Sequence, residues 1–114
     1  MKYGLKKNTI SQINAVFANH PEIEQAIIYG SRARGNYKEG SDIDLALKGR
    51  ALNLRIVDRV NFELDDLLLP YCFDIIDFNQ ISNAGFIDHI NQYGIVFYNS
   101  LNASHLNNQN AGHD

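Results

Sequence analysis

The sequence lacks long apolar runs: its apolar stretches, such as residues 26–29 and 67–69, fall far short of the roughly 20 residues that span a bilayer. No membrane span is therefore expected. The first residues carry charge without the continuous apolar region and small-residue cleavage site of a secretory signal, which predicts a cytoplasmic protein. Cysteine is nearly absent, and the single Cys72 can form neither an internal disulfide bond nor a metal cluster. We interpret it as a small apolar residue in a buried strand.

Positive charge is scarce, since 10 lysines and arginines face 13 aspartates and glutamates, for a net charge of −3. Proteins that bind nucleic acid or anionic membranes usually cluster lysine and arginine, so neither partner is expected here. Any phosphate that this chain binds must be attracted by a local site.

The length of 114 residues, with 45% of them hydrophobic, allows one core. We predict a single domain over residues 1–98. Residues 99–114 are mostly polar, and few apolar side chains there can offset the entropy of ordering the backbone, so this tail is predicted to be disordered.

Turn residues and apolar spacing divide the chain into helices and strands. Thr9 and the glutamine three residues later have the form of a capping box, and Pro21 blocks continuation of the helix that follows. Helices are predicted over residues 9–19 and 53–69. A third is predicted from the spacing of Ile81, Ile87 and Ile90, with Gly94 at its C-cap position. Strands are predicted over residues 25–29, 42–47, 71–78 and 95–98. The glycine-rich segment 30–40 is predicted to be a loop with one helical turn starting at Ser31.

The most informative segment is the run Gly30-Ser31-Arg32-Ala33-Arg34-Gly35, followed after a short polar loop by Ser41-Asp42-Ile43-Asp44. A glycine directly after a strand lets the backbone approach a bulky anion. The serine after it can offer its backbone N–H and its hydroxyl to phosphate oxygens at a helix start. We therefore predict that Gly30 and Ser31 cradle a triphosphate.

Aspartates follow this loop in a pattern that suits a metal ion. Asp42 and Asp44 are two residues apart on one predicted strand, so their carboxylates share a face and repel unless a cation lies between them. Mg²⁺ prefers oxygen ligands from carboxylates and phosphates. On the strand predicted at 71–78, Asp74 and Asp77 point to opposite faces, so only one of them can join the site. We choose Asp74, whose apolar flanks predict a burial that needs a metal or cationic partner, and keep Asp77 as the alternative.

Three carboxylates around one or two Mg²⁺ ions suit phosphoryl or nucleotidyl transfer, because metal ions neutralise phosphate charge and activate the attacking oxygen. In this scheme Asp42 and Asp44 hold the ion that bridges the phosphates. Asp74 helps to hold a second ion and assists deprotonation of an acceptor hydroxyl.

Arg32 and Arg34 complete a candidate nucleotide-binding set with Gly30, Ser31 and Ser41. An arginine fork beside a triphosphate would stabilise the charge of the transferred group. Both arginines can also be interpreted as ordinary surface charges. Arg34 can also be interpreted as a contact to a partner protein.

The Gly-Ser pair, the two arginines, the aspartates at 42 and 44 and the later aspartate at 74 together resemble the DNA polymerase beta superfamily of nucleotidyltransferases. Over residues 23–98 the sequence is similar to its smallest branch, the minimal nucleotidyltransferases. The resemblance implies an α/β fold, α+β in some schemes, with helices packed on a small mixed sheet whose open face carries the site. It also implies catalytic and metal-binding roles for Asp42, Asp44 and Asp74, with Mg²⁺ as cofactor and ATP as substrate.

Minimal nucleotidyltransferases are typically encoded beside a small helical protein of the HEPN type, with which they form toxin–antitoxin pairs. The resemblance therefore implies an antitoxin that adds AMP from ATP to its toxin, often at a tyrosine, and that works in a homo- or hetero-oligomer. Two alternatives stay open. One is a non-catalytic module that neutralises its partner by covering it, and the other is transfer to a small molecule such as an aminoglycoside.

Other polar and aromatic residues have simpler interpretations. No histidine has a second ligand at metal spacing, so all four are interpreted as surface residues: His20, His89, His105 and His113. Three aromatic residues around the third predicted strand are interpreted as core rather than as a base-stacking platform: Tyr71, Phe73 and Phe78.

Overall fold

The computed structural model describes residues 1–101. Its strands are β1 (Gln25–Tyr29), β2 (Ile43–Lys48), β3 (Phe73–Asp77) and β4 (Ile95–Asn99). Its helices are α1 (Lys7–Ala18), α2 (Ser31–Arg34), α3 (Leu54–Asp65) and α4 (Ala84–Tyr93), with the 3₁₀ helix η1 (Phe78–Gln80) after β3. The strands form one sheet in the order β3-β2-β1-β4, in which β1 is antiparallel to β2 and β4 whereas β2 and β3 are parallel. This mixed sheet with packed helices confirms the predicted fold class.

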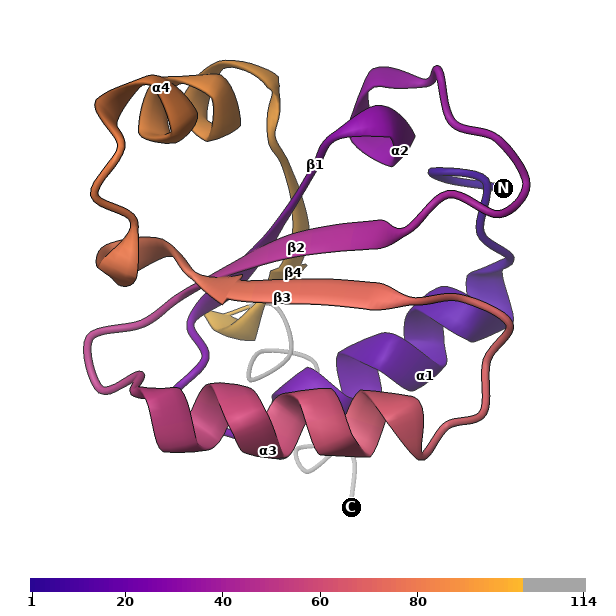
Figure 1. The fold of residues 1–114 in the computed structure, drawn as a ribbon. Helices are drawn as coiled ribbons and strands as arrows, with labels where there is room; N and C mark the ends of the chain where they lie inside the picture. Colours follow the sequence, from indigo (N-terminus) through magenta and orange to yellow (C-terminus); the bar gives the residue numbers. More distant parts are fainter. Residues whose placement is uncertain (102–114) are drawn as a thin grey trace.

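Helices lie on both sides of the sheet: α1 and α3 on one, α2 and α4 on the other (Figure 1). Alternation along β1 divides the apolar side chains between two cores, because Ile28 belongs to the cluster under α1 and α3 while Ile27 and Tyr29 belong to the cluster under α4. The larger cluster includes the fully buried Phe17 of α1 and Leu64 of α3. Burying such a side chain contributes about 1.5–3 kcal/mol.

The first helix begins two residues earlier than predicted. α1 starts at Lys7 after an extended Lys6 whose side chain makes no capping hydrogen bond, so the capping box expected at Thr9 is wrong. A tight turn precedes it, with Tyr3 and Gly4 at positive φ and a backbone hydrogen bond from Leu5 N–H to the Lys2 carbonyl (2.8 Å). Leu5 is fully buried, so this apolar anchor fixes where the chain enters the helix.

The second predicted helix is too long at its end. Asn53 caps α3 by accepting a hydrogen bond from the Ile56 N–H (3.1 Å), as its predicted start requires. The helix stops at Asp65, four residues before the expected end at 69, because Leu68 takes a left-handed conformation (φ +57°) that turns the chain. Leu67 therefore packs on the core from a turn.

The third strand is shorter than the predicted 71–78 segment. Cys72 lies just before β3 and is exposed, so its interpretation as a buried strand residue is wrong. The strand ends at Asp77, whose side chain accepts a hydrogen bond from the Asn79 N–H (3.0 Å) and so starts the unpredicted η1 turn.

The last helix confirms the C-cap position of Gly94, although for a different physical reason. Gly94 has an ordinary φ of −70° rather than a left-handed one. A Cβ atom there would lie 2.4 Å from the Ile90 carbonyl oxygen and 2.5 Å from Ile27 Cγ2. Close packing of α4 on β1 therefore favours glycine at this position.

β4 runs one residue beyond the predicted domain limit. Asn99 ends the strand, and the backbone N–H of Ser100 donates to the Glu24 carbonyl (2.9 Å). The remainder of the predicted tail, residues 102–114, lies outside the described residues. Within residues 1–101, none of the helices combines the length and the apolar character needed to cross a membrane.

Candidate active site

Strand pairing brings the predicted carboxylates together on one face of the sheet. Asp44 is in register with Asp74 across the parallel β2–β3 pair, and Tyr29 is in register with Asp44 across the antiparallel β1–β2 pair. Directly paired residues project to the same face. Asp42 precedes β2 by one residue and therefore shares the parity of Asp44. A row of one tyrosine and two aspartates thus crosses three strands, on the face that α4 partly covers.

Gly30 brings the backbone close to this row. It follows β1 directly and has φ +74° and ψ −154°, a combination that side chains other than hydrogen rarely allow. A Cβ atom at this position would lie 2.5 Å from Asp44 Oδ2. The first turn of α2 begins at Ser31, which is half-buried, so the predicted phosphate cradle lies beside the carboxylates.

Arg32 is 2% exposed, so the surface interpretation is wrong for this residue. Its Nε and Nη2 donate to the Ser41 carbonyl (3.0 and 2.8 Å), its Nη2 also to the Glu39 carbonyl (3.3 Å), and its Nη1 to the Tyr3 carbonyl (2.9 Å). The guanidinium also lies over two aromatic rings, 5.3 Å from the centroid of Tyr37 and 4.9 Å from that of Tyr71. These contacts tie the loop before β2 to the N-terminal turn.

Ser41 and Arg34 differ in how far their polar groups are already used in contacts within the chain. The Ser41 hydroxyl accepts the Lys38 N–H (2.8 Å), while its carbonyl accepts Arg32, so Ser41 shapes the loop that leads to Asp42. Arg34 is exposed, and its guanidinium lies 5.0 Å from the ring centroid of Tyr93 at the end of α4. It is the arginine of the motif that remains at the surface, between α2 and α4.

Uncompensated negative charge shapes the electrostatics of the row. The pKa of the Asp44 carboxyl is raised, first by burial and then by the charges of Asp74 and Asp42, while Arg32 works in the opposite direction. Burial, Asp74 and Asp44 likewise raise the pKa of the Tyr29 phenol. Neighbouring carboxylates that raise the pKa of Asp44 suit a cation between them.

The three carboxylates are ligands of the kind that magnesium prefers, but they do not lie close together around one point. Among residues 1–101, no three histidine, cysteine, aspartate or glutamate side chains are gathered closely enough to enclose one ion. Asp74 is exposed on the edge strand β3, so its predicted burial is wrong.

Asp77, the alternative to Asp74, does not reach this row. It is in register with Leu47, whose side chain belongs to the core under α1 and α3, and it is 8% exposed. Its carboxylate accepts the Asn79 N–H. The structure therefore places Asp74, and not Asp77, beside Asp44.

A hollow of about 760 Å³ lies beside the far end of β3, lined mainly by apolar residues of β3, α3 and the segment 80–86. None of the three candidate aspartates lines it. It is thus separate from the carboxylate row.

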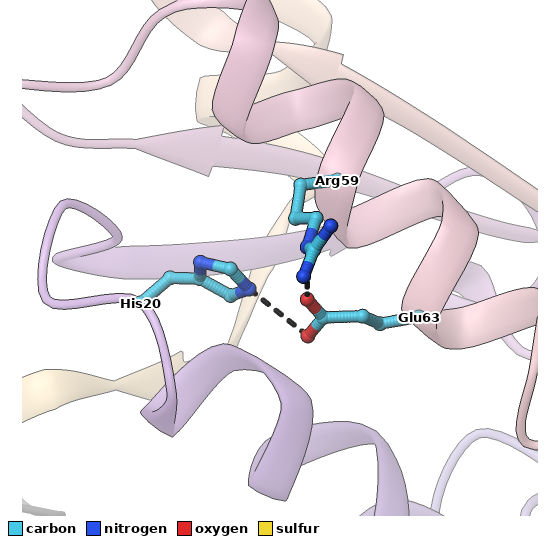
Figure 2. A network of polar contacts seen from close by, with 3 residues as sticks. All are labelled: His20, Arg59 and Glu63. Atoms are coloured by element: carbon cyan, nitrogen blue, oxygen red, sulfur yellow. Dashed lines mark hydrogen bonds and ion pairs between the residues drawn. The ribbon is translucent and has the colours of Figure 1, made fainter.

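The histidines are placed apart from the row as well. His20 is only 13% exposed at its side chain, and its Nε2 lies 3.0 Å from Glu63 Oε1, while Arg59 Nε donates to Glu63 Oε2 at 3.1 Å (Figure 2). The surface interpretation of His20 is therefore wrong, because this network joins the end of α1 to α3. His89 is half-buried beside Tyr93, with ring centroids 5.2 Å apart. The other two histidines lie beyond residue 101.

Tyr29 was not predicted to belong to the site. From the sequence it is the last residue of an apolar strand, and only the pairing with Asp44 reveals its position. Its ring is 7% exposed and packs edge-on against Phe86 of α4, with centroids 5.6 Å apart. The alternation of side chains along β1 was the available signal. It could assign Tyr29 to the face of Asp44 only once the strand that pairs with β1 was known.

The chain is similar to known proteins in both sequence and fold. Residues 11–102 match the model of a family described as polymerase beta, nucleotidyltransferase. The chain is 29% identical over 82 residues to a protein of Methanocaldococcus jannaschii that is described as a candidate protein adenylyltransferase, a match that covers 65% of this chain and 78% of that protein.

Two solved structures share the fold over 90% of this chain. One is a crystal structure of a toxin–antitoxin pair with AMP-PNP, with 19% identity, a TM-score of 0.65 and 80% of that chain covered. The other contains a tri-AMPylated HEPN toxin of Shewanella oneidensis in complex with an MNT antitoxin, with 15% identity, a TM-score of 0.62 and 79% of that chain covered. At these identities the likeness shows the fold alone.

Proposed function

This chain belongs to the polymerase beta nucleotidyltransferase family, and from that premise we propose that it transfers AMP from ATP to a hydroxyl group of a partner protein. The observation that carries the proposal is the register of Asp44 with Asp74 beside the Gly30 turn. A phosphate cradle and a carboxylate pair are the two parts that nucleotidyl transfer requires.

On the nucleotide side, the backbone N–H groups of Gly30 and Ser31 and the Ser31 hydroxyl donate hydrogen bonds to the triphosphate. The exposed Arg34 reaches the phosphates from the surface between α2 and α4. Arg32 and Ser41 act as positioning residues, because their contacts hold the loop that places Asp42.

On the metal side, Asp42, Asp44 and Asp74 would hold magnesium. When bound, magnesium neutralises charge on the triphosphate and makes the acceptor oxygen more nucleophilic. Burial and the charges of Asp74 and Asp42, which together raise the pKa of Asp44, support this assignment.

The transfer itself forms one bond and breaks one. The acceptor oxygen bonds to the α-phosphorus of ATP, and the bond from that phosphorus to the oxygen bridging to the β-phosphate breaks, so that pyrophosphate leaves with the electron pair. The hydroxyl proton passes to the Asp74 carboxylate. Asp74 suits this role because it is exposed on an edge strand, where a protein acceptor has access.

The partner in this proposal is a small helical protein of the HEPN type, and the pair would act as toxin and antitoxin. Support comes from the M. jannaschii relative, which is described as a protein adenylyltransferase candidate, and from the fold shared with toxin–antitoxin structures, one with an AMPylated toxin. The exposed position of Asp74 adds to this support, since a bulky acceptor must approach an open site.

Intact-protein mass spectrometry tests the proposal. A helical protein of the HEPN type is incubated with ATP, Mg²⁺ and either the wild-type chain or the Asp44→Asn variant. We expect adenylate units on the partner with the wild type alone. Absence of transfer by the folded wild type, or equal transfer by the variant, would contradict the proposal.

A second candidate function is a non-catalytic nucleotide-binding module that neutralises its partner by complex formation. It is favoured by one observation: the three carboxylates are not gathered around a common point within the described residues. Under this alternative, Asp44→Asn should form the complex and neutralise the partner as well as the wild type does. Neutralisation that is lost in the variant while the complex persists would exclude it.

A further inference from the structure

A second hollow, of about 770 Å³, lies at the N-terminal end of α1 and is lined by lysines. Its lining consists of Met1, Lys2, Lys6, Lys7, Ile10 and Ser11. The three lysines are exposed, and none of them forms an ion pair with any residue in the range 1–101. We call this feature the lysine hollow.

The fold holds these like charges together instead of letting them disperse. The turn closed by the Leu5–Lys2 hydrogen bond places Lys2 and Lys6 on either side of a buried leucine, and Lys7 is the first residue of α1. The first turn of α1 carries no acidic residue that would lower the local positive potential. The net charge of the chain is −3, so this local cluster of positive charge has the opposite sign to the chain as a whole.

The lysine hollow is connected to the loop that leads to Asp42. The carbonyl of Tyr3, inside the turn, accepts the hydrogen bond from Arg32 Nη1 (2.9 Å). The N-terminal turn lies at the end of the sheet where β2 and β3 begin, which is also the end that carries Asp42 and Asp74 (Figure 1). A protein bound at the lysines can therefore extend around the sheet end to the carboxylate row.

We propose that the lysine hollow docks an acidic segment of the acceptor protein, an inference that rests on the proposed transfer to a protein. Charge complementarity carries it: three unpaired lysines surround a concave surface that also offers the apolar side chain of Ile10. RNA fits less well, because no aromatic residue lines the hollow for base stacking and the basic residues form one cluster rather than a track.

Two matched variants test the docking role. Lys7→Glu and Arg55→Glu each reverse one exposed charge in the first turn of a 12-residue helix, so both place a favourable negative charge at a helix start and should leave the fold intact. AMP transfer to the HEPN-type acceptor protein is measured against acceptor concentration. We expect Lys7→Glu to raise the KM for the acceptor about tenfold, with kcat and the KM for ATP unchanged, and Arg55→Glu to change none of the three by more than about twofold. The difference should shrink at high salt, where exposed charges are screened.

Equal effects of the two variants, or a fall in kcat without a rise in the acceptor KM, would overturn the docking role. A second assay separates this outcome from failure of the proposed function, because it needs no catalysis. Binding of a fluorescent peptide of aspartate and glutamate is measured by anisotropy without ATP. Binding that Lys7→Glu weakens and Arg55→Glu leaves unchanged supports the inference, while no binding, or tighter binding of an oligouridylate of equal length, refutes it.

Discussion

The strongest test of the site geometry is the substitution Gly30→Ala. Gly30 occupies a backbone region that costs another residue about 1–3 kcal/mol, and its added Cβ would lie 2.5 Å from Asp44 Oδ2. The carboxylate is the end of a side chain and can rotate away, so the backbone strain accounts for most of the stability loss. At about 4–8 °C per kcal/mol for a domain of this size, the melting temperature should fall by roughly 5–20 °C.

The loss of activity should exceed what this strain explains. Rotation of the Asp44 carboxylate away from Gly30 displaces a proposed metal ligand, and a displacement of about 1 Å can cost on the order of 100-fold in rate. AMP transfer is measured well below the melting temperature of the variant, and unfolding is followed by far-ultraviolet circular dichroism.

Two other glycines provide the controls. Gly35 also has a positive φ (+84°), but a Cβ there meets nothing within 4 Å, and at Gly40 a Cβ meets nothing and φ is not positive. Gly35→Ala should therefore cost about 1–2 kcal/mol with little loss of transfer, and Gly40→Ala should be neutral in both assays. If Gly30→Ala transfers AMP as well as Gly35→Ala does, the close approach of Gly30 to Asp44 has no catalytic importance and the reasoning fails.

Two further predictions concern charge. Asp44→Asn should abolish transfer yet stabilise the free protein at pH 7 by up to about 1 kcal/mol, because Asp44 is half-buried with a raised pKa. Native Asp44 binds its proton more tightly than Asp44 of the unfolded chain does. The wild type is therefore most stable below the ordinary aspartate pKa, where Asp44 is protonated in both states, and it loses stability as pH rises through the raised pKa. In urea unfolding measured across pH, the stability gained by Asp44→Asn should vanish in acid. A gain that does not depend on pH would contradict the raised pKa of Asp44 as its cause. Arg32→Lys should lower the free energy of unfolding by about 1–3 kcal/mol, because the single nitrogen of an ammonium group cannot reach the carbonyls that the guanidinium contacts from three separate nitrogens. Arg34→Lys should change it by no more than about 0.5 kcal/mol, and equal losses in the two variants would refute the positioning role of Arg32.

Strong local signals made much of the fold predictable. The first strand was predicted with its observed limits, Gln25–Tyr29, because a proline and a glycine bound a short apolar run. Errors arose where a distant contact overrode the pattern. The leucines after Asp65 continue a helical stripe in the sequence, yet Leu68 turns the chain and Leu67 reaches the core without a helix.

The site was predictable in composition but not in arrangement. The motif identifies Asp42 and Asp44, and alternation along the third strand allows only one of Asp74 and Asp77 to join them. The structure places Asp74 in register with Asp44, although the burial for which Asp74 was chosen is wrong. The register of Asp44 with Asp74 could not be deduced, because parallel pairing depends on how the whole crossover packs. The burial of Arg32 was missed for the same reason, since the carbonyls that bind it come from two separate segments of the chain.

The parallel pairing of β2 with β3 also bears on the order in which the protein folds. The β1–β2 pair joins neighbouring segments, whereas Asp44 meets Asp74 only after the intervening segment with α3 has closed. Closing the longer loop costs more chain entropy before any contact compensates for it. We therefore expect the proposed phosphate cradle to form earlier than the carboxylate pair, so that a partly folded chain presents the loop of Gly30 before it can assemble the proposed metal site.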